Sequence, residues 1–243
     1  MTVADLLLLG LAVVAGAVAA VAGFGIGSIL TPALGVVHGI RLAVALVAVP
    51  HALATAVRLW ALRDAVDRRV LVSFGLASAA GGLVGALLHS WLSSPVLGVI
   101  LGLLLVIAGL LELTGIGRRL RFPGPWAVGA GLASGAFGGL VGNQGGIRSA
   151  ALLRFDLAPR ALVATATASA ILVDAARLPV YLATGGGEMF ERWPTILLLT
   201  LGVVAGTFIG APLLRRLPEA IFRRGLAVLL VGLGMALVAG IGR

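Results

Sequence analysis

The chain has 243 residues, of which 60% are hydrophobic and only 11% are charged, and its mean hydropathy is +1.15. Soluble domains average about 25% charged residues, so the composition excludes a soluble protein and indicates one integral membrane domain over residues 1–243. The net charge of +9 would suggest a nucleic-acid partner in a soluble protein. Here the arginines cluster between apolar runs, as cytoplasmic loops require, so we expect a lipid bilayer and no nucleic acid.

The first element is Asp5–Val37, which is too long for one comfortable span and is interrupted by glycines at Gly23–Gly27. We expect a broken re-entrant hairpin here. Residues 1–22 lack the basic region of a signal peptide, carry Asp5 and continue directly into the glycine loop, so we expect them in the mature protein.

Six further segments are apolar runs of about 20 residues, the length that crosses a hydrocarbon core of about 30 Å. They are Arg41–Ala61, Val70–Trp91, Pro95–Leu113, Leu157–Ala183, Pro194–Leu214 and Phe222–Ile241.

Three arginine clusters separate these segments, and arginine-rich loops stay in the cytoplasm. The clusters are Arg63, Arg68 and Arg69; Arg118, Arg119 and Arg121; and Arg215, Arg216, Arg223 and Arg224. The connections His89–Pro95 and Gly185–Trp193 are poor in arginine and are predicted outside. Segment Pro125–Arg154 must then begin and end in the cytoplasm, which predicts a second re-entrant hairpin. Both termini are predicted external, in a multi-pass protein of the bacterial cytoplasmic (inner) membrane.

The two hairpins belong to an internal repeat with an offset of 119 residues. Each repeat, 1–120 and 121–243, would hold one broken hairpin and three transmembrane helices, about eight hydrophobic segments in all. Three crossings are an odd number, so the second copy is inverted, and inverted repeats are typical of transporters. We therefore expect an all-α integral membrane fold of two inverted-topology repeats. The matched pairs include Gly23 with Gly142, Gly27 with Gly146, Arg41 with Arg160, and Arg58 with Arg177.

The two glycine loops are the predicted substrate site. Broken backbone at membrane depth is tolerated only where protein or water lines it. Half-helices starting near Gly27 and Gly146 would point free N–H groups and a positive dipole end inward, which suits an anion. A guanidinium at Arg148 matches an oxyanion, although this side chain could instead reach the cytoplasmic surface. The candidate substrate-binding residues are Gly25, Gly27, Ser28, Asn143, Gln144, Gly145, Gly146, Arg148, Ser149 and Thr165.

Other polar residues within the spans have structural and functional interpretations. Asp174 and Arg177 are spaced i, i+3 and are expected to pair. His51 could carry a coupling proton or could be a satisfied histidine between helices. Thr165 could line a path or pack tightly.

The loops carry the pattern of a known family. Gly23, Gly25, Gly27, Pro32 and Leu34 form one copy, and the second has Gln144, Gly145, Arg148 and Ser149. In these motifs the chain resembles the TauE/SafE family of sulfite exporter-like membrane proteins along its whole length. Ile26 and Ala151 depart from the family pattern, where a glycine and a proline are common. The resemblance implies transport of sulfite, organosulfonates or similar sulfur-containing anions.

We therefore expect a secondary transporter that exports a small sulfur-containing oxyanion by alternating access, with a possible coupling proton or ion. Neither a cofactor nor enzymatic activity is expected. One alternative is a membrane-embedded hydrolase with Ser28 as nucleophile and His51 as base, although their repeat equivalents are Ile147 and Ala170. Another is a cation-exporting relative, for which Asp174 is the only deep acid in the sequence.

Overall fold

The computed structural model describes residues 2–115, 126–214 and 216–240. These residues form helices and connections without a strand, and seven helices are long and apolar enough to cross a membrane. The predicted fold class, an all-α multi-pass membrane protein, is confirmed. The cluster Arg118, Arg119 and Arg121, the single residue Arg215 of the third cluster, and the predicted boundary at residue 120 lie outside the described residues.

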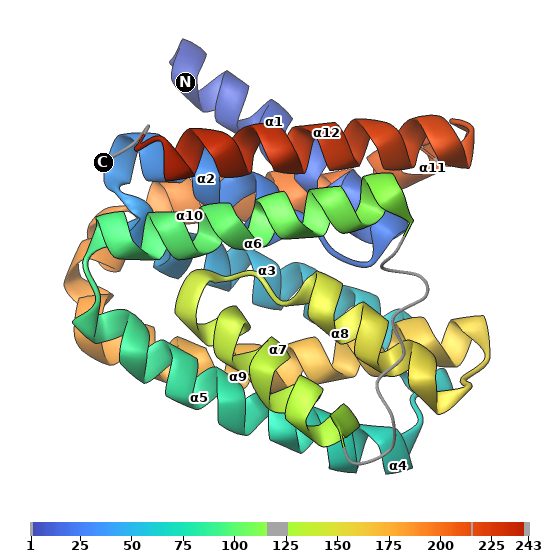
Figure 1. Cartoon of the computed structure of the whole chain (residues 1–243). Helices are drawn as coiled ribbons and strands as arrows, with labels where there is room; N and C mark the ends of the chain where they lie inside the picture. Colours follow the sequence, from blue (N-terminus) through green and yellow to red (C-terminus); the bar gives the residue numbers. More distant parts are fainter. Residues whose placement is uncertain (1, 116–125, 215, 241–243) are drawn as a thin grey trace.

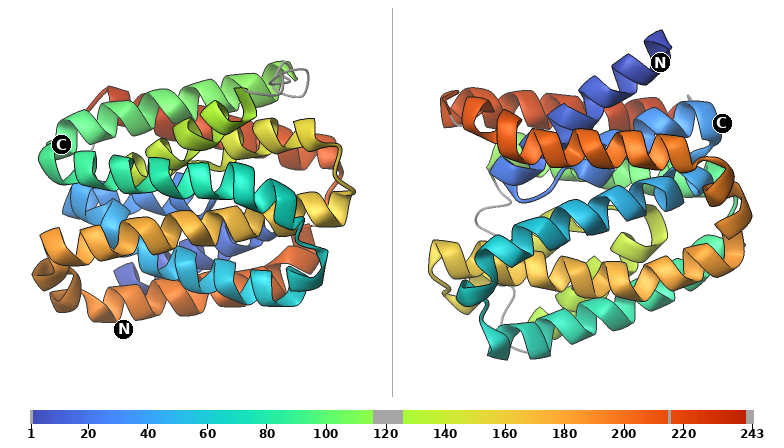
Figure 2. Two further views of the ribbon diagram at one scale, coloured as in Figure 1. Left: turned by 90° about the horizontal axis from the view of Figure 1, so that it is seen from below. Right: turned by 180° about the vertical axis from the view of Figure 1, so that it is seen from behind.

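The first half of the chain comprises α1 (Val3–Ala22), α2 (Ile26–His38), α3 (Ile40–Leu62), η1 (Arg63–Ala65), α4 (Arg68–Val70), η2 (Leu71–Gly75), α5 (Leu76–Trp91) and α6 (Ser94–Thr114). The second half comprises α7 (Trp126–Val141), α8 (Gly145–Leu152), η4 (Leu153–Phe155), α9 (Pro159–Glu191), α10 (Trp193–Ala205), η5 (Gly206–Gly210), α11 (Ala211–Leu214) and α12 (Glu219–Val238). Most of the long helices run roughly along one direction (Figures 1 and 2).

The helices correspond to the predicted segments, with two differences in length. The predicted connection Gly185–Trp193 is mostly helical, because α9 continues to Glu191 with a kink at Gly185. The first hairpin is unequal: α1 has 20 residues and is itself long enough to cross a bilayer, whereas α2 has 13. Many side chains at the start of α1 are exposed, and Figure 1 shows this end projecting from the bundle.

Two helical hairpins turn inside the bundle. Gly23 to Gly25 join α1 to α2, and Gly142 to Gln144 join α7 to α8. The φ angles of Gly23, Gly25 and Gly142 are +80°, +134° and +72°, values that favour glycine. The hairpins open at opposite ends of α9. The second hairpin ends with α8, which leads into the start of α9. The first hairpin ends with α2, where His38 shares a cavity with Thr184 and Glu188 near the C-terminal end of α9.

Corresponding helices of the two halves exchange partners. Helix α3 packs on α9 and α6 on α12, while α1 packs on α10 and α7 on α5. The contact between α6 and α12 is reciprocal: a Cβ at Gly102 would lie 2.7 Å from the Gly234 oxygen, and one at Gly234 would lie 2.6 Å from the Gly102 oxygen. Small residues allow such close approach in membranes. Equivalent packing of the corresponding helices fits the predicted inverted repeat, although the repeat itself stays a prediction.

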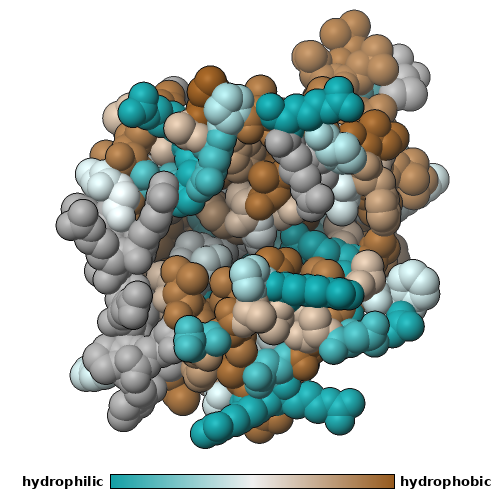
Figure 3. Space-filling view, turned by 90° about the vertical axis from the view of Figure 1, so that its right-hand side faces the viewer, coloured by the Kyte–Doolittle hydropathy of each residue, from teal (hydrophilic) through white to brown (hydrophobic). Residues whose placement is uncertain are grey.

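The described arginines of the predicted clusters gather at one end of the bundle, which we call the arginine-rich end. It contains Arg63, Arg68, Arg69, Arg216, Arg223 and Arg224, and it faces the viewer in Figure 3, where hydrophilic side chains spread across it. Helix α1 begins and α12 ends toward the opposite end (Figure 1).

Candidate functional site

The two hairpin loops touch each other in the interior of the protein. A Cβ at Gly27 would lie 2.2 Å from the Gly142 carbonyl oxygen, and one at Gly145 would lie 2.1 Å from the Phe24 Cβ. The Ser28 hydroxyl donates to Asn143 Oδ1 across the junction, at 3.4 Å. The starts of α2 and α8 therefore meet, as the two half-helix site requires.

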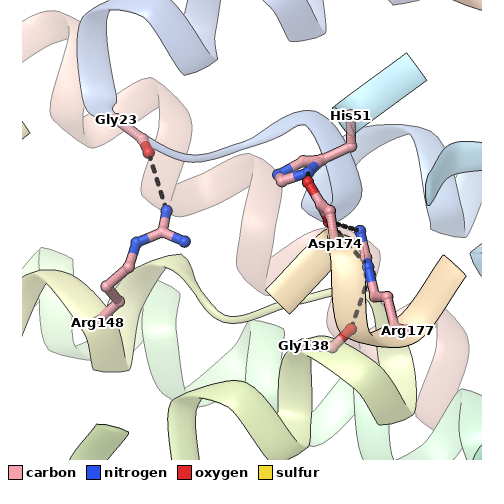
Figure 4. A network of polar contacts seen from close by, with 6 residues as sticks. All are labelled: Gly23, His51, Gly138, Arg148, Asp174 and Arg177. Atoms are coloured by element: carbon pink, nitrogen blue, oxygen red, sulfur yellow. Dashed lines mark hydrogen bonds and ion pairs between the residues drawn. The ribbon is translucent and has the colours of Figure 1, made fainter. Parts of the chain in front are cut away.

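Arg148 is buried next to this junction. Its side chain is 2% exposed, and Nη2 donates to the Gly23 carbonyl oxygen at 3.4 Å. Its Nε and Nη1 have no hydrogen-bond partner among the described residues. The guanidinium does not reach the surface; it points to the tip of the first hairpin (Figure 4).

A second guanidinium, which the sequence analysis did not include in the site, lies near Arg148. Arg58 Nη1 donates to the Ala19 carbonyl oxygen at 2.8 Å, and its buried Nε has no partner among the described residues. The charge of Arg58 acts on Arg148. Both arginines therefore bind carbonyl oxygens near the C-terminal end of α1, where the helix dipole is negative, and each keeps unpaired donors.

A polar network lies on the other side of the loops (Figure 4). Asp174 Oδ1 accepts from Arg177 Nε at 2.9 Å and lies 2.7 Å from Arg177 Nη2, which confirms the pair predicted from the i, i+3 spacing. Asp174 Oδ2 lies 2.7 Å from His51 Nδ1. Arg177 Nη1 donates to the Gly138 carbonyl oxygen in α7 at 2.7 Å. The network therefore joins α3, α9 and the second hairpin.

A cavity of about 320 Å³ extends from the loops toward the arginine-rich end. Asn143, Gln144 and Ser149 contribute its polar lining, and α6 contributes apolar side chains. The Gln144 Oε1 has no partner among the described residues. An ion pair between Glu112 and Arg223 lies at the outer part of this cavity. Arg148 does not line the cavity, but its neighbours Ile147 and Ser149 do.

A second cavity of about 240 Å³ lies at the opposite end. His38, Arg41 and Glu188 are among its lining residues, and Tyr181 and His89 form its inner part. Tyr181 donates to the Gly139 carbonyl oxygen, and the two rings lie 4.9 Å apart. The two cavities share no lining residue.

The structure brings together most of the predicted site. The residues at or beside the junction are Gly25, Gly27, Ser28, Asn143, Gln144, Gly145, Gly146, Arg148 and Ser149. Thr165 lies apart from them near the start of α9, where its hydroxyl accepts from the Asp67 N–H at 2.9 Å. Ser28 and His51 bind different partners, Asn143 and Asp174, so no hydrogen bond joins the pair that the hydrolase alternative needs.

Two features of the site were not predicted from the sequence: the contact of His51 with Asp174, and the position of Arg58. The second omission had a signal: Arg58 matches Arg177 in the repeat, and Ala19 matches Gly138. Each arginine donates from Nη1 to the matching carbonyl oxygen.

Comparison with known proteins adds one finding. A family model described as Sulfite exporter TauE/SafE matches residues 8–237, nearly the whole chain. No match was found among curated proteins or among solved structures.

Proposed function

The chain belongs to the TauE/SafE sulfite exporter family, and from this premise we propose that it exports a small sulfur-containing oxyanion, sulfite or a short sulfonate. Membership of this family implies a multi-pass membrane transporter of sulfur-containing anions.

The observation that carries the proposal is the buried, incompletely paired guanidinium of Arg148. Removing a charge from water costs several kcal/mol unless partners compensate it. Arg148 has one long hydrogen bond and two nitrogens without a partner among the described residues. An oxyanion supplies both the charge and the acceptor oxygens that this fork lacks. Arg58 adds a second positive charge with an unpaired donor.

The start of α8 supplies further donors. Helix N-termini bind anions through free N–H groups and the helix dipole. Gln144 precedes the first turn of α8, and Asn143, Gln144 and Ser149 line the cavity that leads there. Their amide and hydroxyl groups can donate to an oxyanion that moves between the cavity and Arg148.

The two cavities support alternating access. They lie toward opposite ends of the bundle, and the two hairpin loops touch each other between them. The partner exchange between the halves fits an inverted repeat. In such a protein, one conformation exposes the site to one side of the membrane, and the conformation in which the two repeats exchange their roles exposes it to the other side. The positive-inside rule assigns the arginine-rich end to the cytoplasm of the bacterial inner membrane, with both termini external.

Thermal unfolding of the detergent-purified protein tests this proposal. Sulfite, sulfate, thiosulfate, small sulfonates, carboxylates and divalent cations are compared on wild type, Arg148→Ala and Arg160→Ala. A ligand at about 100 times its Kd stabilises the folded state by about 2.7 kcal/mol. We expect sulfur oxyanions to stabilise wild type and Arg160→Ala, whose exposed arginine controls for general charge, but not Arg148→Ala. Stabilisation by cations alone would overturn the proposal.

A further inference from the structure

The buried network of His51, Asp174 and Arg177 has no part in the anion site described above. We propose that this network is a proton site: His51 binds one proton when an anion binds beside Arg148, so that the two move together. This inference rests on the proposed function and extends it to the coupling ion.

The geometry leaves one nitrogen of the His51 ring available. Nδ1 lies 2.7 Å from Asp174 Oδ2, so in the neutral ring the Nδ1–H donates to the carboxylate. The contacts of the described residues show no hydrogen-bond partner for Nε2. The His51 side chain is 13% exposed, whereas Asp174 and Arg177 are almost fully buried. The ring is therefore not completely enclosed by protein, and the carboxylate orients it.

The charges around His51 make its protonation depend on the anion. Asp174 and Arg177 already neutralise each other, so a proton on His51 gives the network a net positive charge. Arg148 on α8 also acts on His51 with a positive charge. Helices α7 and α10, which pack on α3, carry no charged side chain. The remaining ionisable groups of α1, α2 and α6 lie near the helix ends, at Asp5, His38 and Glu112.

An anion at Arg148 removes the repulsion that opposes the proton. By linkage, a protonated His51 strengthens anion binding by the same factor. In Figure 4 the His51 ring lies next to Asp174, on the side of the network that faces Gly23 and Arg148. The anion site and the proton site therefore lie on the two sides of the touching hairpin loops.

A backbone contact joins the proton site to the loop that holds the anion. Arg177 Nη1 donates to the Gly138 oxygen, and a Cβ at Gly142 would lie 3.6 Å from this nitrogen. Asn143 and Gln144 follow directly. A change in the pairing of Asp174 with His51 and Arg177 thus acts on the second hairpin.

The proton balance needs no further reactant. A hydronium ion on one side of the membrane transfers its proton to His51 Nε2: an O–H bond of the hydronium breaks, leaving water, and an N–H bond forms. On the opposite side the N–H bond breaks, and the proton returns to water as hydronium. One proton accompanies each anion in the same direction.

Isothermal titration calorimetry counts the proton. Sulfate and ethanesulfonate are the probes because both keep a fixed charge between pH 6 and pH 9, so any proton taken up binds to the protein. Titration in two buffers of different ionisation enthalpy gives the number of protons bound per anion. In wild type we expect the uptake to approach one proton per anion bound. The anion Kd should rise by as much as about tenfold per pH unit between pH 6 and pH 9. In His51→Gln we expect anion binding without proton uptake.

His89→Gln is the matched control, because His89 is also buried, but its ring nitrogens lie 2.8 and 3.2 Å from the Leu140 and Arg41 carbonyl oxygens, and it has no acidic partner among the described residues. Its proton uptake should equal that of wild type. Anion binding without proton uptake in wild type, or uptake that persists in His51→Gln, would overturn this inference alone. Failure of wild type to bind sulfate, ethanesulfonate and sulfite alike would overturn the proposed function, and the inference with it.

Discussion

Arg58 and Arg177, 119 positions apart, make the same hydrogen bond in the two halves of the protein. Each donates from Nη1 to a carbonyl oxygen in the first helix of its own hairpin, at Ala19 and Gly138, over 2.8 and 2.7 Å. Only Arg177 also has an acid, because Thr55 stands where the second half has Asp174. The two arginines therefore share one backbone contact, but Arg177 is paired with an acid and Arg58 is not.

Giving Arg58 the acid that Arg177 has should weaken anion binding. Thr55 is fully buried, and its hydroxyl has no partner among the described residues. In Thr55→Asp, a carboxylate three residues before Arg58 can pair with it and repel an incoming anion. We expect the sulfite or sulfonate Kd to rise at least about tenfold, equivalent to about 1.4 kcal/mol. Calorimetry measures this, and Thr55→Val, which adds no charge, should bind like wild type.

Replacing Arg148 by methionine should separate stability from binding. Apolar residues of similar volume often stabilise a protein by about 1–4 kcal/mol when they replace buried charges. We expect Arg148→Met to unfold at a higher temperature than wild type without ligand, and to gain nothing from sulfur oxyanions. A lower unfolding temperature in the absence of ligand would show that Arg148 supports the fold through its bond to Gly23.

Gly27 and its repeat equivalent Gly146 should respond differently to alanine. A Cβ at Gly27 would lie 2.2 Å from the Gly142 oxygen, whereas one at Gly146 has nothing within 4 Å. Overpacking typically costs about 1–3 kcal/mol. Thermal unfolding should show this loss for Gly27→Ala and almost none for Gly146→Ala. Equal effects of the two substitutions would contradict the close contact of the loops.

The predicted orientation can be tested by labelling, since the chain has no cysteine. Ser93, between α5 and α6, and Leu217, between η5–α11 and α12, are both exposed and lie at opposite ends of the bundle. In intact cells a membrane-impermeant maleimide should label Ser93→Cys, and it should label Leu217→Cys only after permeabilisation. The reverse pattern would invert the topology.

The parts of the fold that sequence could predict are those with local causes. Apolar runs of sufficient length predicted the spans, and the glycine clusters predicted breaks that require positive φ at Gly23, Gly25 and Gly142. The Asp174–Arg177 pair followed from helical spacing.

What sequence could not predict depends on long-range packing. His51 and Asp174 are 123 residues apart and meet only because α3 packs on α9. Thr165 was expected near the loops, but it lies at the start of α9, bonded to Asp67. The helical segment that follows the kink at Gly185 and ends at Glu191 was also missed, because three successive glycines suggest a loop.

The lack of any shared lining residue between the two cavities has a consequence for the cell's energy supply. The two hairpin loops are in close contact at Gly27 and Gly142, which closes the space between them at that point. A bacterial membrane stores energy as an ion gradient, which a water-filled path would dissipate. The close contact between the loops thus fits a carrier that moves its cargo without opening a water-filled path.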